Sequence, residues 1–271
     1  MCGISGIISY SKKHIIKDLL QSIYYIQHRG QDSYGITTIN SNNNLCVIKN
    51  HGLIDTDTIN ITEGDELYND SNVGIGHVRY PTTGSKGVDS IQPFHKYVNF
   101  KDVIIMSHNG QIKIKEDYIP YLKENKIELE AISDSELLLN IILLKLSCPT
   151  SLSSDIISKI FNDISIMLEG SYSIILYIKG YGMIALRDKY GIKPLIVGYK
   201  DGTYLISSES VSLQSMHYKI LCDVKPGEAI IFNNDYKKKN FEIERINYID
   251  DAVLRPCIFE WVYMANGASI I

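Results

Sequence analysis

The residues at the start of the chain, MCGISGIISY, could provide a self-contained nucleophile. Removal of Met1 would leave Cys2 with a free α-amino group beside its thiol. The amine titrates near ~7.7–8.0 and the thiol near ~8.5, so the amine can take the thiol proton at neutral pH without a histidine. This is the arrangement of an N-terminal nucleophile. The alternative is that Cys2 is a small buried residue at the beginning of a strand.

Four polar segments along the chain could complete a site around this nucleophile. They are HRGQDS at residues 28–33, GHVRYPTTG at 76–84, SHNG at 107–110 and SDSE at 133–136. Together they supply an arginine for a carboxylate, an aspartate for an ammonium group and an Asn-Gly pair for an oxyanion. A site for the amide of an amino acid needs these groups. Each segment alone also fits loop chemistry, because Asn-Gly favours hairpins and Pro-Thr-Thr-Gly favours turns.

The sequence lacks several other catalytic and ligand-binding patterns. It contains no P-loop, H-E-x-x-H or G-x-S-x-G motif. Its five cysteines are widely separated and form neither a C-x-x-C pair nor a His-spaced pair, so we expect no disulfide framework, no metal and no cofactor. A papain-like pair of Cys2 with His28, His77 or His108 stays open as an alternative, although each histidine alone is better explained by core packing.

The composition is typical of a globular protein in water. Hydrophobic residues make up 45% of the chain and charged residues 21%, with a net charge of -4. That charge gives no general attraction to nucleic acid or to anionic membranes. No stretch reaches the ~18 apolar residues of a membrane span, and the start lacks the charged-then-apolar order of a secretory signal. We therefore expect a cytoplasmic protein without nucleic-acid or membrane partners.

Strand patterns outnumber helix patterns, and many of the strands pair as hairpins. This balance predicts sheets that are each covered by helices on one side. The segment 133–146 begins with a capping-box pattern, Ser133 followed by Glu136. Helices are predicted at 15–27, 133–146 and 156–169, and strands at 3–10, 35–40, 45–50, 73–78, 103–108, 171–178, 182–188, 195–199, 204–208 and 228–232.

The order of the polar segments behind Cys-Gly-Ile resembles the glutaminase domain of class II glutamine amidotransferases, which are Ntn hydrolases. The resemblance is closest to the amidophosphoribosyltransferases, and HRGQDS and CIFEWVYMA favour them over the glucosamine-phosphate synthase and asparagine synthetase types. It implies an α/β (α+β) fold built as a four-layer α/β/β/α sandwich. The segments that carry the resemblance are HRGQDSYGI, GHVRYPTTG, IQPF, SHNG, SDSE, LRDKYGIKPLIVG, SSES, DVKPGEAI and CIFEWVYMA.

The resemblance also implies a role for individual residues. Cys2 would be the nucleophile, with its own α-amine as base, and would form a thioester with glutamine before water releases glutamate. The Asn109 side chain and the Gly110 N–H would form the oxyanion hole. The remaining residues would bind substrate or order the site: Arg79 and Thr82 would hold the α-carboxylate of glutamine, Asp134 its α-ammonium group, and Arg29 would orient the N-terminus or link the site to a neighbour.

The resemblance divides the chain into a glutaminase domain at residues 2–250 and a C-terminal extension at 251–271. After MA at 264–265 the chain departs from the family, in which a linker leads into a phosphoribosyltransferase domain. We therefore expect glutamine hydrolysis that does not depend on phosphoribosyl pyrophosphate, with ammonia supplied alone or to a separate acceptor synthase subunit. A non-catalytic glutamine-binding or regulatory remnant is the alternative. The oligomeric state stays open, with a homo-oligomer among the choices.

Overall fold

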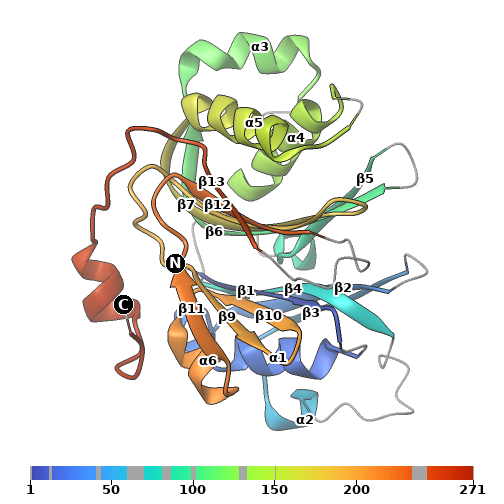
Figure 1. Ribbon diagram of the computed structural model, residues 1–271, viewed down its shortest axis with the longest axis vertical. Helices are drawn as coiled ribbons and strands as arrows, with labels where there is room; N and C mark the ends of the chain where they lie inside the picture. The colour runs from blue at the N-terminus through green and yellow to red at the C-terminus, as the bar shows by residue number, and fades with distance from the viewer. Residues whose placement is uncertain are drawn as a thin grey trace.

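Two antiparallel β-sheets lie face to face, and helices cover the outer face of each (Figure 1). The computed structural model describes residues 2–11, 14–40, 44–59, 70–80, 87–98, 102–127, 133–149, 151–233 and 243–270. The four layers run from helices through two sheets to helices, as the sequence resemblance implied. None of the helices in these ranges has the length and apolar character that a membrane span requires.

The first sheet has seven strands in the order β11-β9-β10-β1-β4-β2-β3. All seven residues of β1 are buried because both of its faces are covered. Ile4 and Ile8 point toward the second sheet, whereas Ile7 points toward the helices. The strand bounds are β1 Gly3–Ser9, β2 Ser33–Asn40, β3 Leu45–His51, β4 Ser71–Arg79, β9 Ile196–Lys200, β10 Thr203–Ser207 and β11 Lys219–Asp223.

The second sheet has six strands in the order β13-β12-β8-β7-β6-β5. Its longest strand, β6, pairs with β7 from Ile104 opposite Ile178 to Ile114 opposite Leu168. The polar segment SHNG lies within β6, and the Ile112 N–H of the same strand donates to Asp134 of SDSE at 3.1 Å. The strand bounds are β5 Phe94–Val98, β6 Asp102–Ile114, β7 Leu168–Ile178, β8 Gly182–Arg187, β12 Glu228–Asn233 and β13 Glu244–Asn247.

The helices pack by apolar stripes on the outer sheet faces. Helix α1 buries residues at helical spacing, including Leu19 and Ile23, against Gly74 and Gly76 of β4. A Cβ on either glycine would lie within 2.8 Å of these side chains, so the glycines allow the close approach of α1. The helix bounds are α1 Ile16–Tyr24, α2 Thr56–Ile59, α3 Ile119–Glu124, α4 Asp134–Leu146, α5 Ser154–Met167 and α6 Ser210–Ser215.

Most of the predicted elements are confirmed with small changes in their bounds. Ser133 is the N-cap of α4, and its Oγ accepts a hydrogen bond from the Glu136 N–H at 3.2 Å. The sequence prediction missed β5, β11, β13, α2, α3 and α6, which are short. It also missed four short 3-10 or π-helical turns: η1 Gln27–Arg29, η2 Val88–Ser90, η3 Glu116–Tyr118 and η4 Glu260–Met264.

Candidate active site

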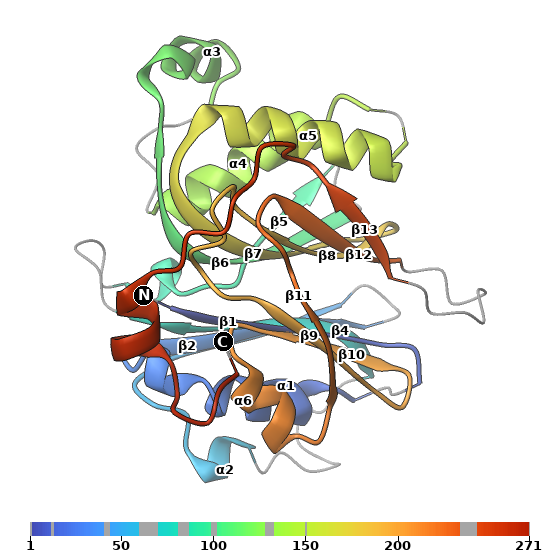
Figure 2. The ribbon, with the colours of Figure 1, turned by 60° about the vertical axis from the view of Figure 1, so that its left-hand side comes forward.

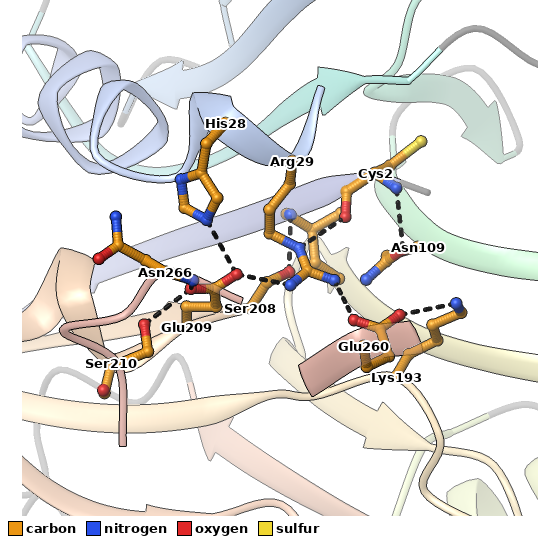
Figure 3. A network of polar contacts seen from close by, with 12 residues as sticks. Cys2, His28, Arg29, Asn109, Lys193, Ser208, Glu209, Ser210, Glu260 and Asn266 are labelled. Atoms are coloured by element: carbon orange, nitrogen blue, oxygen red, sulfur yellow. Dashed lines mark hydrogen bonds and ion pairs between the residues drawn. The ribbon is translucent and has the colours of Figure 1, made fainter. Parts of the chain in front are cut away.

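Cys2 lies immediately before β1, at the end of the first sheet that faces β6 of the second sheet. Its main-chain N–H donates a hydrogen bond to Oδ1 of Asn109, on β6, at 3.2 Å. The two residues are 107 positions apart in the chain, and this contact connects the two sheets. The Cys2 sulfur points away from the charged groups that surround Arg29 (Figure 3). The expected nucleophile and the expected oxyanion residue are therefore neighbours.

The side-chain amide of Asn109 is fully buried, and of its two polar atoms only the oxygen has a hydrogen-bond partner among the described residues. Oδ1 accepts from Cys2, while Nδ2 has no hydrogen-bond partner among the described residues. A buried donor without a partner costs free energy, so such a group is expected to have a function. An amide whose oxygen faces the Cys2 nitrogen necessarily presents its NH2 group elsewhere, where it can donate to a developing oxyanion.

Gly110 follows Asn109 where the chain has no room for a side chain. A Cβ at this position would lie 2.1 Å from the Ser171 carbonyl oxygen and 2.6 Å from Nε2 of His108. Successive N–H groups of a strand alternate in direction, so the Gly110 N–H points to the same edge of β6 as the His108 N–H. That edge is the one on which β5 pairs with earlier residues of β6.

Burial raises the pKa of the Cys2 thiol above its ordinary value. A hydrogen bond from the Tyr80 main chain and the charges of Arg29 and Arg79 act in the opposite direction and do not outweigh burial. The resting thiol is therefore protonated at neutral pH and would need a base in order to act as a nucleophile.

The histidines do not supply that base among the described contacts. Nδ1 of His108 lies 2.8 Å from the Ser135 hydroxyl, and Nε2 of His28 lies 3.0 Å from Glu209. Both ring nitrogens of His77 are buried without a hydrogen-bond partner in the described part of the chain, and burial lowers its pKa to about 3. These contacts do not favour the papain-like alternative, and the α-amine stays the proposed base.

Arg29 is fully buried and joins Cys2 to two glutamates (Figure 3). Its Nε donates to the Cys2 carbonyl oxygen at 3.0 Å, Nη1 to Glu209 at 2.6 Å and Nη2 to Glu260 at 2.6 Å. The second oxygen of Glu260 accepts from Nζ of Lys193 at 2.7 Å. The guanidinium therefore lies at the centre of a charged network that binds the main chain of Cys2.

The C-terminal segment forms part of this network. Glu260 begins η4, and the second oxygen of Glu209 accepts hydrogen bonds from the Asn266 N–H at 2.9 Å and the Ser269 hydroxyl at 2.7 Å. Both ribbon views show the C-terminal segment beside the N-terminus (Figures 1 and 2). Residues from both ends of the chain thus order the same site. Burial alone would raise the pKa of Glu209, but hydrogen bonds from His28 and Arg29 and the Arg29 charge lower it to about 2.

The residues expected to bind the substrate lie on elements around Cys2. Arg79 ends β4, where Nη1 donates to the Ser90 hydroxyl at 2.7 Å and lies 3.8 Å from Asp32. Asp134 begins α4 and accepts the Ile112 N–H at 3.1 Å. The Asp134 charge also acts on buried His108 of β6. The start of α4 therefore lies beside the edge of β6 to which the His108 and Gly110 N–H groups point. Thr82 lies outside the described residues.

Sequence reasoning assigned no role to Lys193, Glu209 or Glu260. All three lie in segments that carry the family resemblance, namely LRDKYGIKPLIVG, SSES and CIFEWVYMA. A charged residue in an otherwise apolar run, such as Glu260 in CIFEWVYMA, was the available signal. The described residues contain no group of three or more His, Cys, Asp or Glu side chains arranged to hold a metal ion.

Comparisons with known proteins show which proteins this chain is similar to. A family described as "Glutamine amidotransferase domain" matches residues 85–215. Amidophosphoribosyltransferase of Escherichia coli (strain K12) is 37% identical over the whole of this chain and 53% of its own length, and that of Methanocaldococcus jannaschii is 32% identical over the whole chain and 57% of its own length. Residues 85–215 therefore match a glutamine amidotransferase domain, and the whole chain is similar to part of the amidophosphoribosyltransferases. The chain spans about half the length of the curated relatives that it matches.

Solved structures show the same fold. The glutamine phosphoribosylpyrophosphate amidotransferase from B. subtilis, complexed with ADP and GMP, superposes with a TM-score of 0.77 at 24% identity over the whole of this chain and 54% of its own. A structure described as the allosteric regulatory enzyme of purine biosynthesis gives a TM-score of 0.79 at 25% identity, with the same coverage. The four-layer arrangement of this chain is therefore the Ntn-hydrolase sandwich of those structures.

Proposed function

We propose that this amidotransferase hydrolyses the side-chain amide of L-glutamine to glutamate and ammonia, with Cys2 as the nucleophile. The observation that carries the proposal is the contact of the Cys2 nitrogen with Asn109 Oδ1, which leaves the buried Asn109 NH2 group without a protein partner among the described residues. Nucleophile, base and oxyanion donor then meet at one point. Similarity to the glutamine amidotransferases supports glutamine as the substrate.

The reaction begins once Met1 has been removed. The neutral α-amine of Cys2 takes the thiol proton as the sulfur attacks the amide carbon of glutamine. Negative charge develops on the former carbonyl oxygen and is stabilised by Asn109 Nδ2 and the Gly110 N–H. The ammonium group of Cys2 then returns the proton to the amide nitrogen, ammonia leaves, and a thioester remains. Water, deprotonated by the same amine, attacks the thioester and releases glutamate and the free thiol.

We propose that charged side chains of the site bind the opposite charges of glutamine in the ground state. Arg79 and Thr82 would bind the α-carboxylate of glutamine, and Asp134 its α-ammonium group. Asp32 and Ser90 already restrain the Arg79 guanidinium, and the Ile112 N–H restrains the Asp134 carboxylate. Such restraint reduces the side-chain entropy that binding would otherwise cost.

We further propose that the ammonia is delivered to a separate acceptor synthase subunit. The support is an exposed apolar surface on the C-terminal segment, where Ile258, Trp261, Val262 and Tyr263 are each more than half exposed. Apolar patches of this kind mark interaction sites. A cavity of about 490 Å³, lined by Arg29, Glu260 and Trp261 among others, lies next to this surface. The expected cytoplasmic location and the oligomeric state stay predictions.

Glutamate release from purified protein tests the proposal. Mass spectrometry should show that active protein begins at Cys2, and Cys2→Ala should abolish release while retaining glutamine binding. Cys46→Ala, which alters a half-buried cysteine on β3, is the matched control and should keep full activity. Full activity in protein that retains Met1 would contradict the role of the α-amine. Glutamine binding without turnover in protein that begins at Cys2 would favour the non-catalytic alternative.

A further inference from the structure

Gln92 is a buried amide in a bend before β5, with a side chain in contact with β6. Its Oε1 accepts a hydrogen bond from the His108 N–H at 2.7 Å, and its Nε2 donates to the His108 carbonyl oxygen at 3.2 Å. The residue is 7% exposed. One side chain thus binds both main-chain polar groups of the residue that precedes Asn109.

This contact replaces the strand pairing that ends two residues earlier. Strands β5 and β6 pair with Phe94 opposite Met106 and His95 opposite Ile105. Continuing this register by two residues would set Gln92 opposite His108. Pro93 has no N–H, and the chain bends here, so the main chain does not continue the ladder. The Gln92 side-chain amide, which has one acceptor and one donor like a peptide group, continues the ladder instead.

The same side chain also reaches the residue next to Asp134. Gln92 Nε2 lies 3.2 Å from the Ser135 hydroxyl, which contacts Nδ1 of His108 at 2.8 Å and Oδ1 of Asp134 at 3.2 Å. Burial lowers the pKa of His108, so its ring is neutral at pH 7. If Nδ1 carries the ring proton, both Gln92 and His108 donate to Ser135, whose hydroxyl proton is then directed to Asp134.

The backbone of Gln92 is itself held by the first sheet. A Cβ on Gly35, in β2, would lie 2.4 Å from the Gln92 carbonyl oxygen, so the two main chains are in direct contact. Residue 35 pairs with His77 on β4, the strand that ends at Arg79. Gln92 therefore spans from the first sheet to β6 and to the start of α4.

We propose that Gln92 is a positioning residue that fixes the oxyanion donors of residues 109–110 and the ammonium-binding carboxylate of Asp134 in one geometry. The inference rests on the proposed glutamine hydrolysis and adds a residue to which that reaction assigned no role. Gln92 does not touch the reacting atoms and acts through His108 and Ser135. Misplacement of a catalytic group by about 1 Å can cost about 10²-fold in rate, so loss of this clamp is expected to be visible in kinetics.

The decisive variant is Gln92→Glu. An ionised carboxylate can still accept from the His108 N–H but repels the His108 carbonyl oxygen and cannot donate to Ser135. Once protonated, the carboxyl regains a donor and resembles the glutamine. Burial raises the pKa of such a carboxyl, so the protonated form is accessible at mildly acidic pH. The charged and titratable groups around this position include His108 on β6, Asp134 on α4, His77 and Arg79 on β4, Lys49 on β3, Asp89 in η2, and Lys193.

The experiment measures kcat and KM for glutamine from pH 5.5 to pH 8.5 for the wild type, Gln92→Glu and Gln92→Met. We expect Gln92→Met to lower kcat roughly 10–100-fold and raise KM at every pH. The ratio of Gln92→Glu activity to wild-type activity should rise as the pH falls, because protonation of the introduced carboxylate restores the missing donor. Gln21→Glu, on α1, is the matched control and should keep a constant ratio.

Two results would overturn the inference: unchanged kcat and KM in Gln92→Met, or a pH-independent ratio for Gln92→Glu. If the Gln92 variants do not fold, Ser135→Ala tests the arm to Asp134, and it should raise KM more than it lowers kcat; an unchanged KM would contradict the inference. A wild type that begins at Cys2 and hydrolyses no glutamine would refute the proposed function itself, which is a separate outcome.

Discussion

Replacement of Glu260 by alanine should lower both the stability and the glutaminase rate of the protein, because the Glu260 carboxylate forms ion pairs with two cations. Its oxygens lie 2.6 Å from Arg29 Nη2 and 2.7 Å from Lys193 Nζ, and the side chain is 3% exposed. Burial alone would raise the pKa of Glu260, but the charges and hydrogen bonds of Arg29 and Lys193 outweigh it and lower the pKa. The carboxylate is therefore ionised across the neutral range and interacts with both cations.

The magnitude follows from the geometry of the network. Removing one partner of a buried ion pair typically costs ~3–5 kcal/mol. Arg29 keeps its 2.6 Å contact with Glu209, so we expect a value near the lower end of that range. A loss of about 3 kcal/mol corresponds to a decrease in Tm of roughly 6–12 °C for a domain of this size. Since Arg29 Nε also binds the Cys2 carbonyl oxygen, kcat should fall together with stability.

Thermal unfolding and glutaminase kinetics of Glu260→Ala test this reasoning. Glu124→Ala, at an exposed position on α3, is the control and should change Tm little. Adding Lys193→Met to Glu260→Ala removes one of the two cations and should recover part of the lost stability, so the double variant should be more stable than the sum of the single effects predicts. A Tm unchanged by Glu260→Ala, or strict additivity in the double variant, would refute the proposed electrostatic coupling.

Three further predictions follow from the site. Asn109→Ala should lower kcat by roughly 10²–10³ with little change in KM, as steady-state kinetics would show, because it removes a donor used only in the transition state. Arg79→Ala and Asp134→Asn should instead raise KM, because the native side chains are proposed to bind charges that glutamine carries in the ground state. Equal KM changes in all three variants would contradict this assignment of roles. The pKa of His77 is about 3 in the folded protein and 6.5 in the unfolded reference, so stability is fully present above pH 6.5 and is lost as the pH falls toward 3. Thermal unfolding at pH 7 and pH 5 should show a smaller pH effect in His77→Leu than in the wild type.

Local sequence pattern was sufficient for the long elements. The apolar residues of 15–27 recur at helical spacing, and the helix found is α1, Ile16–Tyr24. Ser133 was predicted as a cap and does accept the Glu136 N–H. In such segments, burial of one stripe and satisfaction of helix-end N–H groups depend on nearby residues only. The sequence pattern alone therefore contains the physical signal.

The missed elements depend on residues far away in the chain. Strand β11 alternates between partly buried and exposed positions over only five residues and exists because β9 pairs with it. Helix α6 is six residues long and is stabilised by packing on the first sheet. Short segments of this kind have no decisive propensity of their own, so tertiary contacts decide their structure.

The contacts within the site are even harder to predict from local sequence, because they join residues far apart in the chain. Residue types suggested an oxyanion pair and charged binding groups, and the family resemblance assigned them roles. Neither the residue types nor the resemblance indicated that Arg29 would bind Glu209, 180 positions later, and Glu260, 231 positions later. The register that places Gln92 beside His108 is likewise a property of the paired strands. A single sequence contains no information on such distances unless strand pairing is known.

The geometry also links the proposed base to the proposed oxyanion donor. Asn109 can direct its NH2 group at the substrate only while its oxygen is engaged elsewhere, and the Cys2 nitrogen engages that oxygen. Arg29 holds the Cys2 carbonyl on the other side, so the nitrogen is fixed between the two. An α-amine at this position can donate the same hydrogen bond and still use its lone pair to accept the thiol proton. One nitrogen can therefore orient the proposed oxyanion donor and also serve as the proposed base, and both roles require Cys2 to be held in place immediately before β1.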